Sequence, residues 1–147
     1  MNQLNPLTIL LVEDDPADQK LIRNSLKDQK IANDLYIVNS GEEGMDYLHH
    51  QGDYKNGYPQ PDLILLDLNM PGMGGKEFLR KIKDDMDLKQ IPVIILTTSD
   101  SERDIIESYK LQASGYVSKP VTLDEFRQVM ERIEEYWFML CKRPPKE

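Results

Sequence analysis

Cysteine is nearly absent from this chain of 147 residues, because Cys141 is its only one. A single cysteine cannot form a disulfide within the chain, and it excludes a zinc site built from several cysteines. Long apolar runs are also missing, since no stretch approaches the roughly 20 residues that a membrane helix needs. The N-terminus lacks the pattern of a secretory signal. We therefore expect a cytoplasmic protein with no membrane partner.

Positive charge is scarce relative to negative charge. The chain has 18 Lys and Arg against 26 Asp and Glu, a formal net charge of -8. This balance and the lack of a basic stripe argue against a nucleic-acid partner. The length suits one domain, for which we expect a core over residues 7–140 and a tail over residues 141–147.

Short apolar runs bounded by turn-forming residues predict five buried strands. Segments of helical periodicity separate and follow these runs. This alternation predicts an α/β fold with a doubly wound, five-stranded parallel sheet. The predicted strands are 7–12, 35–38, 63–66, 92–96 and 115–118. The predicted helices are 16–30, a helix after Ser40-Gly41 that contains Met45, Tyr47 and Leu48, then 76–84, 101–112 and a last helix capped by Thr122.

The segment between residues 49 and 61 is a long connection rich in glycine and proline, and we expect no regular structure there. It begins with the adjacent His49 and His50. Neighbouring helix positions point about 100° apart, so we do not expect these two imidazoles to share a metal.

Polar groups follow four of the predicted strands. Glu13 and Asp14 follow the first, Asp67 the third, Thr97 the fourth and Lys119 the fifth. The carboxyl ends of parallel strands lie at one edge of the sheet, where α/β folds bind ligands, so these groups should meet. Crowded carboxylates need a cation, and an all-oxygen site suits Mg²⁺. With this metal, the Asp67 carboxylate could attack phosphorus and form an aspartyl phosphate.

With these motifs the chain resembles the receiver domain of two-component response regulators. The resemblance covers about residues 7–140 and rests on four motifs, at residues 12–14, 66–71, 96–98 and 116–120. It implies a flavodoxin-like (receiver) fold, phosphorylated by a histidine kinase or a histidine phosphotransfer protein. Among receivers, the chain is most similar to the stand-alone ones associated with bacterial phytochrome-type histidine kinases.

The resemblance also implies a role for each matching position. Asp67 would be the phosphoacceptor, and Mg²⁺ would be held by the acceptor and its acidic neighbours. Binding of a downstream protein, which the sequence does not identify, would switch through the fourth helix, the last strand and the last helix. Such a domain is not an enzyme acting on external substrates. The remaining implied roles are Asp14 as direct metal ligand, Glu13 through water, the Asn69 carbonyl as metal ligand, Lys119 on the phosphoryl oxygens, Thr97 and Tyr116 as switch residues, and Asn69 and Ser99 as positions that tune phosphate lifetime.

The last helix carries an apolar stripe at helical spacing, which predicts an extended C-terminal helix. The stripe consists of Phe126, Met130, Ile133, Trp137 and Leu140. Its first three residues fit packing against the sheet. Tyr136, Trp137 and Phe138 lie beyond what a compact core needs, and we expect them to form a homodimer contact, because aromatic residues are enriched in interface cores.

Two enzyme classes are disfavoured and one binding function stays open. A phosphatase of the haloacid dehalogenase type needs a second Asp two residues after the nucleophile, where this chain has Asn69. A P-loop GTPase is excluded because the Gly-Lys-Ser/Thr loop is absent. The remaining alternative is a receiver-like interaction module that works without phosphate.

Overall fold

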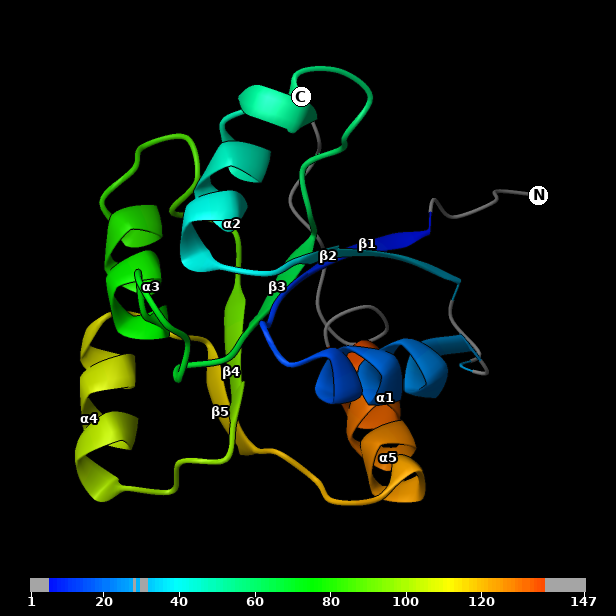
Figure 1. The fold of residues 1–147 in the computed structure, drawn as a ribbon. Coiled ribbons are helices and arrows are strands. Elements are labelled where there is room, and N and C mark those ends of the chain that lie inside the picture. The colour runs from blue at the N-terminus through cyan, green and yellow to red at the C-terminus, as the bar shows by residue number, and fades with distance from the viewer. Residues whose placement is uncertain (1–5, 28, 30–31, 137–147) are drawn as a thin grey trace.

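The computed structural model describes residues 6–27, 29 and 32–136, and within them five strands alternate with five α-helices (Figure 1). The strands are β1 (Leu7–Val12), β2 (Asn33–Val38), β3 (Leu63–Leu66), β4 (Val93–Thr97) and β5 (Gly115–Ser118). The helices are α1 (Pro16–Lys27), α2 (Gly41–Leu48), α3 (Gly75–Lys83), α4 (Glu102–Lys110) and α5 (Leu123–Glu134), and the short 3-10 helix η1 (Gly52–Tyr54) follows α2.

The strands form one parallel sheet in the order β2-β1-β3-β4-β5, which confirms the predicted doubly wound fold. The chain winds outward in one direction from β1 to β2 and in the other from β3 to β5. The reversal falls between β1 and β3, and open α/β sheets bind ligands outside the carboxyl ends of the strands at such a point. Glu13 and Asp67 are the residues that directly follow these two strands.

Helices cover both faces of the sheet (Figure 1). Helices α1 and α5 pack together on one face, and α2, α3 and α4 lie on the other. Successive strand side chains point to opposite faces. In β1, Ile9 and Leu11 accordingly belong to the cluster with Phe126, whereas Leu10 and Val12 belong to the cluster with Phe78. This double burial explains why the strands read as continuous apolar runs.

Several predicted boundaries were wrong by one to three residues. Strand β2 begins at Asn33 rather than at residue 35, because pairing with β1 continues to Leu7. Strand β4 begins after Pro92, which lacks an N–H for the ladder, and extends to Thr97, which pairs with Ser118. Helix α1 ends at Lys27 rather than at residue 30.

Helices α3 and α4 differ from their predicted bounds mainly at the caps. Helix α3 begins at Gly75 and ends at Lys83, one residue early at each end. Helix α4 is shorter than predicted because Ser101 is its N-cap, and Gln112, with φ 71°, lies in left-handed geometry beyond its end.

The connection after α2 is more ordered than the sequence suggested. It contains η1. Tyr54 and Tyr58 on this segment form a cluster with Tyr36 and Tyr47, and the ring centroids of its contacting pairs are 4.9 to 6.1 Å apart. The hydroxyl of Tyr47, a fully buried residue, donates a hydrogen bond of 2.8 Å to the Pro59 carbonyl. Aromatic packing therefore orders a segment that its glycines and prolines predicted to be irregular.

Helix α5 begins as predicted. Thr122 and Glu125 form a reciprocal capping box, and Phe126, Met130 and Ile133 are buried. Trp137, Phe138 and Leu140 lie outside the described residues. In the described part of the chain, no helix combines the length and apolar character needed to cross a membrane.

Candidate functional site

Three carboxylates meet where β1 and β3 end. Val12 and Leu66 pair in the sheet, so Glu13 and Asp67 leave it side by side. One carboxylate oxygen from each of Glu13, Asp14 and Asp67 lies within 4.8 Å of the others. Glu13 and Asp67 are 1% and 5% exposed, while Asp14 is half-buried. Buried like charges at this separation repel each other and require a cation.

The Lys119 side chain supplies one cation. Its backbone N–H donates to the Thr97 carbonyl at 2.8 Å, which fixes the residue directly after β5. Its Nζ lies 2.6 Å from Glu13 Oε1 and 3.5 Å from Asp67 Oδ2. A third carboxylate oxygen, Asp18 Oδ2 from the first turn of α1, lies 2.7 Å from Nζ. The Lys119 side chain is only 6% exposed, so these contacts are little screened by water.

The pKa values of Glu13 and Lys119 both lie above their usual values. The shift favours the neutral form of Glu13 and the charged form of Lys119. Burial raises the pKa of Glu13 to about 7; the Asp67 charge adds to this effect and Lys119 opposes it. Burial alone would lower the pKa of Lys119, but its hydrogen bonds with Asp18 and Glu13 outweigh burial and hold that pKa above its usual value. Lys119 therefore remains an ammonium ion at neutral pH.

Asn69 and Thr97 complete the rim around the Asp67 carboxylate. Thr97 is the last residue of β4 and is fully buried. The Asn69 backbone N–H donates to Asp67 Oδ1 and its side-chain amide donates to Thr97 Oγ1, each at 3.4 Å. These are long, weak hydrogen bonds. The Thr97 hydroxyl thus lies on the β4 side of the Asp67 carboxylate, with Asn69 between the two.

A turn after β3 shapes the loop between Asp67 and α3. Gly75 opens α3, and a Cβ atom there would lie 2.4 Å from the Asp67 carbonyl oxygen and 2.7 Å from the Leu68 Cα. Only glycine permits this approach of α3 to the backbone of Asp67 and Leu68. The turn includes Gly72 in left-handed geometry, with φ 73°.

A second set of contacts links the β4 exit to α4 and β5. The Tyr116 hydroxyl donates to the Ser99 carbonyl at 2.7 Å, and Ser99 Oγ donates to Asp104 Oδ2 at 2.5 Å. Asp104 also pairs with Lys76 from α3, and this pairing lowers the pKa of Asp104. The Ser99 hydroxyl therefore bonds to Asp104 on α4 rather than to Asp67.

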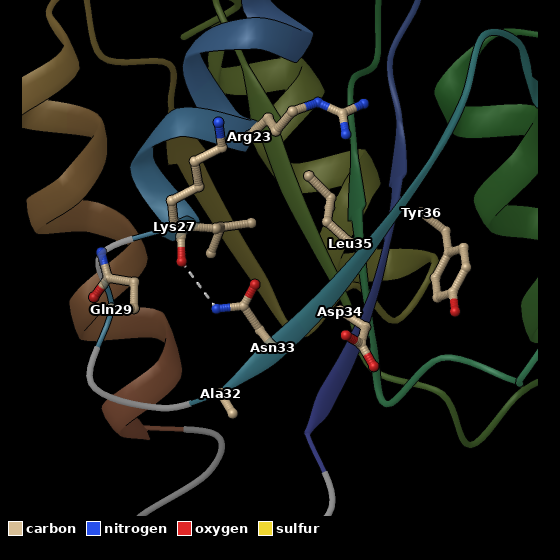
Figure 2. A pocket seen from close by; sticks show the side chains of 9 residues that line it. Arg23, Lys27, Gln29, Ala32, Asn33, Asp34, Leu35 and Tyr36 are labelled. Atoms are coloured by element: carbon tan, nitrogen blue, oxygen red, sulfur yellow. Dashed lines mark hydrogen bonds between the residues drawn. The ribbon is translucent and has the colours of Figure 1, made fainter.

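A cavity also lies away from the acidic site. A cavity of about 480 Å³ opens between the C-terminal part of α1 and the start of β2, where Asn33 donates a hydrogen bond to the Leu26 carbonyl (Figure 2). The residues lining it, which include Arg23, Lys27 and Tyr36, contain none of the site residues predicted from sequence. This cavity is separate from the acidic site.

The structure brings together Glu13, Asp14, Asp67, Asn69, Thr97 and Lys119. Tyr116 and Ser99 contact each other next to that group. Tyr136 is 53% exposed, while Trp137 and Phe138, the other predicted dimer contacts, lie outside the described residues. Sequence reasoning assigned no role to Asp18. The signal available was its position in the first turn of the predicted helix that directly follows Glu13 and Asp14.

The donor set fits the expected metal. Glu13, Asp14 and Asp67 offer only carboxylate oxygens, which suit a hard divalent cation such as Mg²⁺ better than a softer metal that prefers nitrogen or sulfur ligands.

An acidic trio and a lysine at the carboxyl edge of a five-stranded parallel sheet are the arrangement expected of a receiver domain. The chain belongs to the family described as the response regulator receiver domain, which matches residues 9–131. It is 45% identical to response regulator Rcp1 of Synechocystis over 139 residues, covering 95% of this chain and 94% of Rcp1. The chemotaxis protein CheY of Pseudomonas aeruginosa is 32% identical over 129 residues, 88% of this chain and 97% of CheY.

Solved structures give the same assignment. The phosphorylated cyanobacterial phytochrome response regulator RcpA superposes with a TM-score of 0.89 at 41% identity, over 96% of this chain and 100% of RcpA. The Mn²⁺-bound form of Rcp1 gives 0.86 at 43% identity, over 95% and 100% of the two chains. The chain is thus a two-component receiver related to cyanobacterial phytochrome response regulators.

Proposed function

We propose that this receiver accepts a phosphoryl group on Asp67 in a Mg²⁺-dependent reaction and thereby switches the binding of a partner protein. The observation that carries the proposal is the position of the Asp67 carboxylate, which lies within 4.8 Å of two acidic neighbours and 3.5 Å from the ammonium group of Lys119. A nucleophile, a metal-binding oxygen set and a fixed cation are the parts that phosphoryl transfer needs.

The transfer forms one bond and breaks one. An Asp67 oxygen attacks the phosphorus of a phosphohistidine, the P–N bond breaks, and its electron pair returns to the imidazole nitrogen. Lys119 is placed to pair with the developing charge on the phosphoryl oxygens. Glu13, Asp14, the Asp67 carboxylate and the Asn69 carbonyl would hold Mg²⁺, which when bound neutralises charge on the transferring group.

The switch would begin at Thr97. Its hydroxyl lies beside Asn69 at the rim of the acceptor, and a phosphoryl group on Asp67 offers it a strong hydrogen-bond acceptor. Movement of Thr97 would act on the Ser99 loop and so on Tyr116 and α4. Two arrangements of these residues would exist, one without and one with the Thr97 hydroxyl bonded to the phosphoryl group. Phosphorylation would shift the population toward the arrangement in which this bond forms.

The output surface would comprise α4, β5 and α5. Ile106 and Tyr109 on α4 are 48% and 51% exposed, and Val121 before α5 is 85% exposed. This apolar surface suits a protein partner. The proposed phosphodonor is a histidine kinase, of the phytochrome type by analogy with Rcp1 and RcpA, or a histidine phosphotransfer protein.

The predicted homodimer contact at Tyr136, Trp137 and Phe138 is also a proposal. A dimeric mass by light scattering in the parent, lost in Tyr136→Ser with unchanged circular dichroism, would support it. A monomeric mass in the presence and absence of a phosphate mimic would contradict it.

Intact-mass spectrometry tests the phosphoacceptor. The folded protein is incubated with Mg²⁺ and a small acyl-phosphate donor, and we expect a gain of one phosphoryl group. Asp67→Asn and a chelator control should each abolish the gain. Asp62→Asn offers a control near the amino end of the same strand, because it makes the same change in charge and should retain phosphorylation.

No gain in the folded parent would overturn the proposal and favour the interaction module that works without phosphate. A gain that persists in Asp67→Asn would place the acceptor elsewhere.

A further inference from the structure

The Lys119 ammonium has three N–H donors and three carboxylate neighbours. Its Nζ lies 2.6 Å from Glu13, 2.7 Å from Asp18 and 3.5 Å from Asp67. The two short contacts are within hydrogen-bond range, whereas the contact to Asp67 is not a normal hydrogen bond. Lys119 is therefore held beside the acceptor without closing onto it.

Asp18 lies on α1, whereas Glu13 and Asp67, the other two carboxylates that contact Lys119, directly follow strands. Glu13 and Asp67 belong to the acidic trio that fits a metal, and Asp18 does not. A metal ion would draw the carboxylates of Glu13 and Asp67 toward itself and weaken their hold on Lys119. Asp18, on α1, would keep its contact.

The first turn of α1 is itself firmly attached. Asp15 Oδ1 accepts a hydrogen bond from the Ala17 N–H at 2.9 Å, and the side chain of Gln19 donates to the Glu13 carbonyl at 2.6 Å. Asp18 lies between these two anchor points. Asp18 lies on α1, so the helix fixes its position. Its side chain is 23% exposed.

We propose that Asp18 is a positioning residue. It holds the Lys119 ammonium about 3.5 Å from the Asp67 carboxylate, next to the place where the incoming phosphoryl oxygens must lie. This inference rests on the proposed phosphoacceptor function. Without Asp18, Lys119 would lose the short contact that a bound metal does not weaken. Its ammonium group would then no longer be fixed at the place where it must meet the phosphoryl oxygens.

The test measures the phosphorylation rate with a small acyl-phosphate donor at saturating Mg²⁺, by an intact-mass time course. We expect Asp18→Asn to lower the rate about tenfold, because small displacements of catalytic groups have effects of this size or more. The Mg²⁺ concentration that gives half the maximal rate should stay close to that of the parent. Asp18→Glu, which keeps the charge, should recover part of the rate.

Asp15→Asn is the matched control. It removes the same charge three residues away, and Asn caps a helix about as well as Asp. Its rate should match the parent.

A double-mutant cycle separates positioning from a structural effect. If Asp18 acts through Lys119, Asp18→Asn should change the rate by less than about twofold in a Lys119→Met background. Melting temperatures of all variants show whether each is folded.

Two results would overturn the inference, and they are distinguishable. If the parent is phosphorylated and Asp18→Asn behaves like Asp15→Asn, or loses as much rate in the Lys119→Met background, only the role of Asp18 fails. If the folded parent takes no phosphoryl group, the proposed function fails as well.

Discussion

The hydroxyl of Tyr116 donates a 2.7 Å hydrogen bond to the backbone carbonyl of Ser99, which ties β5 to the loop that leaves β4. Two residues before Ser99 in this loop is Thr97, on the rim of the acceptor. A change at the acceptor and a change in the position of Tyr116 therefore act on the same short segment of backbone.

Replacing Tyr116 with Phe should remove this tie and lower the free energy of unfolding by about 1 kcal/mol, the typical net value of one hydrogen bond. Urea denaturation measures the loss. Tyr109→Phe is the control, since Tyr109 is 51% exposed on α4 and should change stability little. Equal effects of the two substitutions would show that the Ser99 contact does not stabilise the fold.

The acceptor loop should be intolerant of a side chain at Gly75. A Cβ there meets backbone atoms of Asp67 and Leu68, which cannot move without displacing the acceptor. Gly75→Ala should cost about 2 to 4 kcal/mol of unfolding free energy and reduce phosphorylation. Gly74→Ala, whose Cβ would lie 3.6 Å from its nearest neighbour, should cost less than about 1 kcal/mol. A Gly75→Ala variant as stable and reactive as the parent would contradict the close approach.

Glu134 should make stability depend on pH. It is 1% exposed, and burial raises its pKa to about 7 while the Asn33 side chain opposes the shift. The folded state thus binds the proton more tightly than the unfolded state, whose pKa is the ordinary 4.5. Because the folded state holds more protons in that window, stability should fall as pH rises from about 4.5 to 7.

Glu134→Gln should reduce this slope, leaving the part that comes from Glu13, whose pKa burial also raises to about 7, and it should raise the unfolding free energy at pH 8 by on the order of 2 kcal/mol. Denaturant titrations across the pH range measure it. The neighbouring Glu135, an exposed residue, supplies the control Glu135→Gln, which should keep the slope of the parent. An unchanged slope in Glu134→Gln would mean that another group titrates.

Lys76 should contribute stability that depends on salt. It bridges α3 to α4 through Asp104 and Glu107, and its side chain is 34% exposed. Partly exposed pairs are worth little, so Lys76→Gln should cost less than about 1 kcal/mol. The cost should shrink in about 1 M salt, where charges are screened. Lys81→Gln is the control, because Lys81 makes a long contact of 3.9 Å with Glu77 on the same helix. A loss that does not respond to salt would argue that Lys76 acts through packing.

The sheet could be predicted because each strand is buried on both faces, which leaves an uninterrupted apolar run in the sequence. The positions of Glu13, Asp67 and Lys119 followed from the rule that parallel strands end at one edge. The ends of β2 and β4 were missed because they depend on pairing partners, Leu7 for Asn33 and Ser118 for Thr97, which local sequence does not reveal.

Long-range side-chain contacts were beyond sequence reasoning for a similar reason. The tyrosines that order the segment after α2 come from β2, α2 and the segment itself. Asp18 reads as an ordinary first-turn acid of a helix, and its contact with Lys119 exists only because α1 and the end of β5 converge. Its separation of 101 residues from that partner hides the pairing.

The order of the site residues along the chain determines when the site can form during synthesis. Glu13 and Asp14 are made early, but Lys119 follows β5, an edge strand held by pairing with β4. A nascent chain still lacking β5 would carry the acidic trio without its internal cation. If Asp67 is the phosphoacceptor that we propose, competence to accept phosphate is therefore expected only after β5 has left the ribosome and paired with β4.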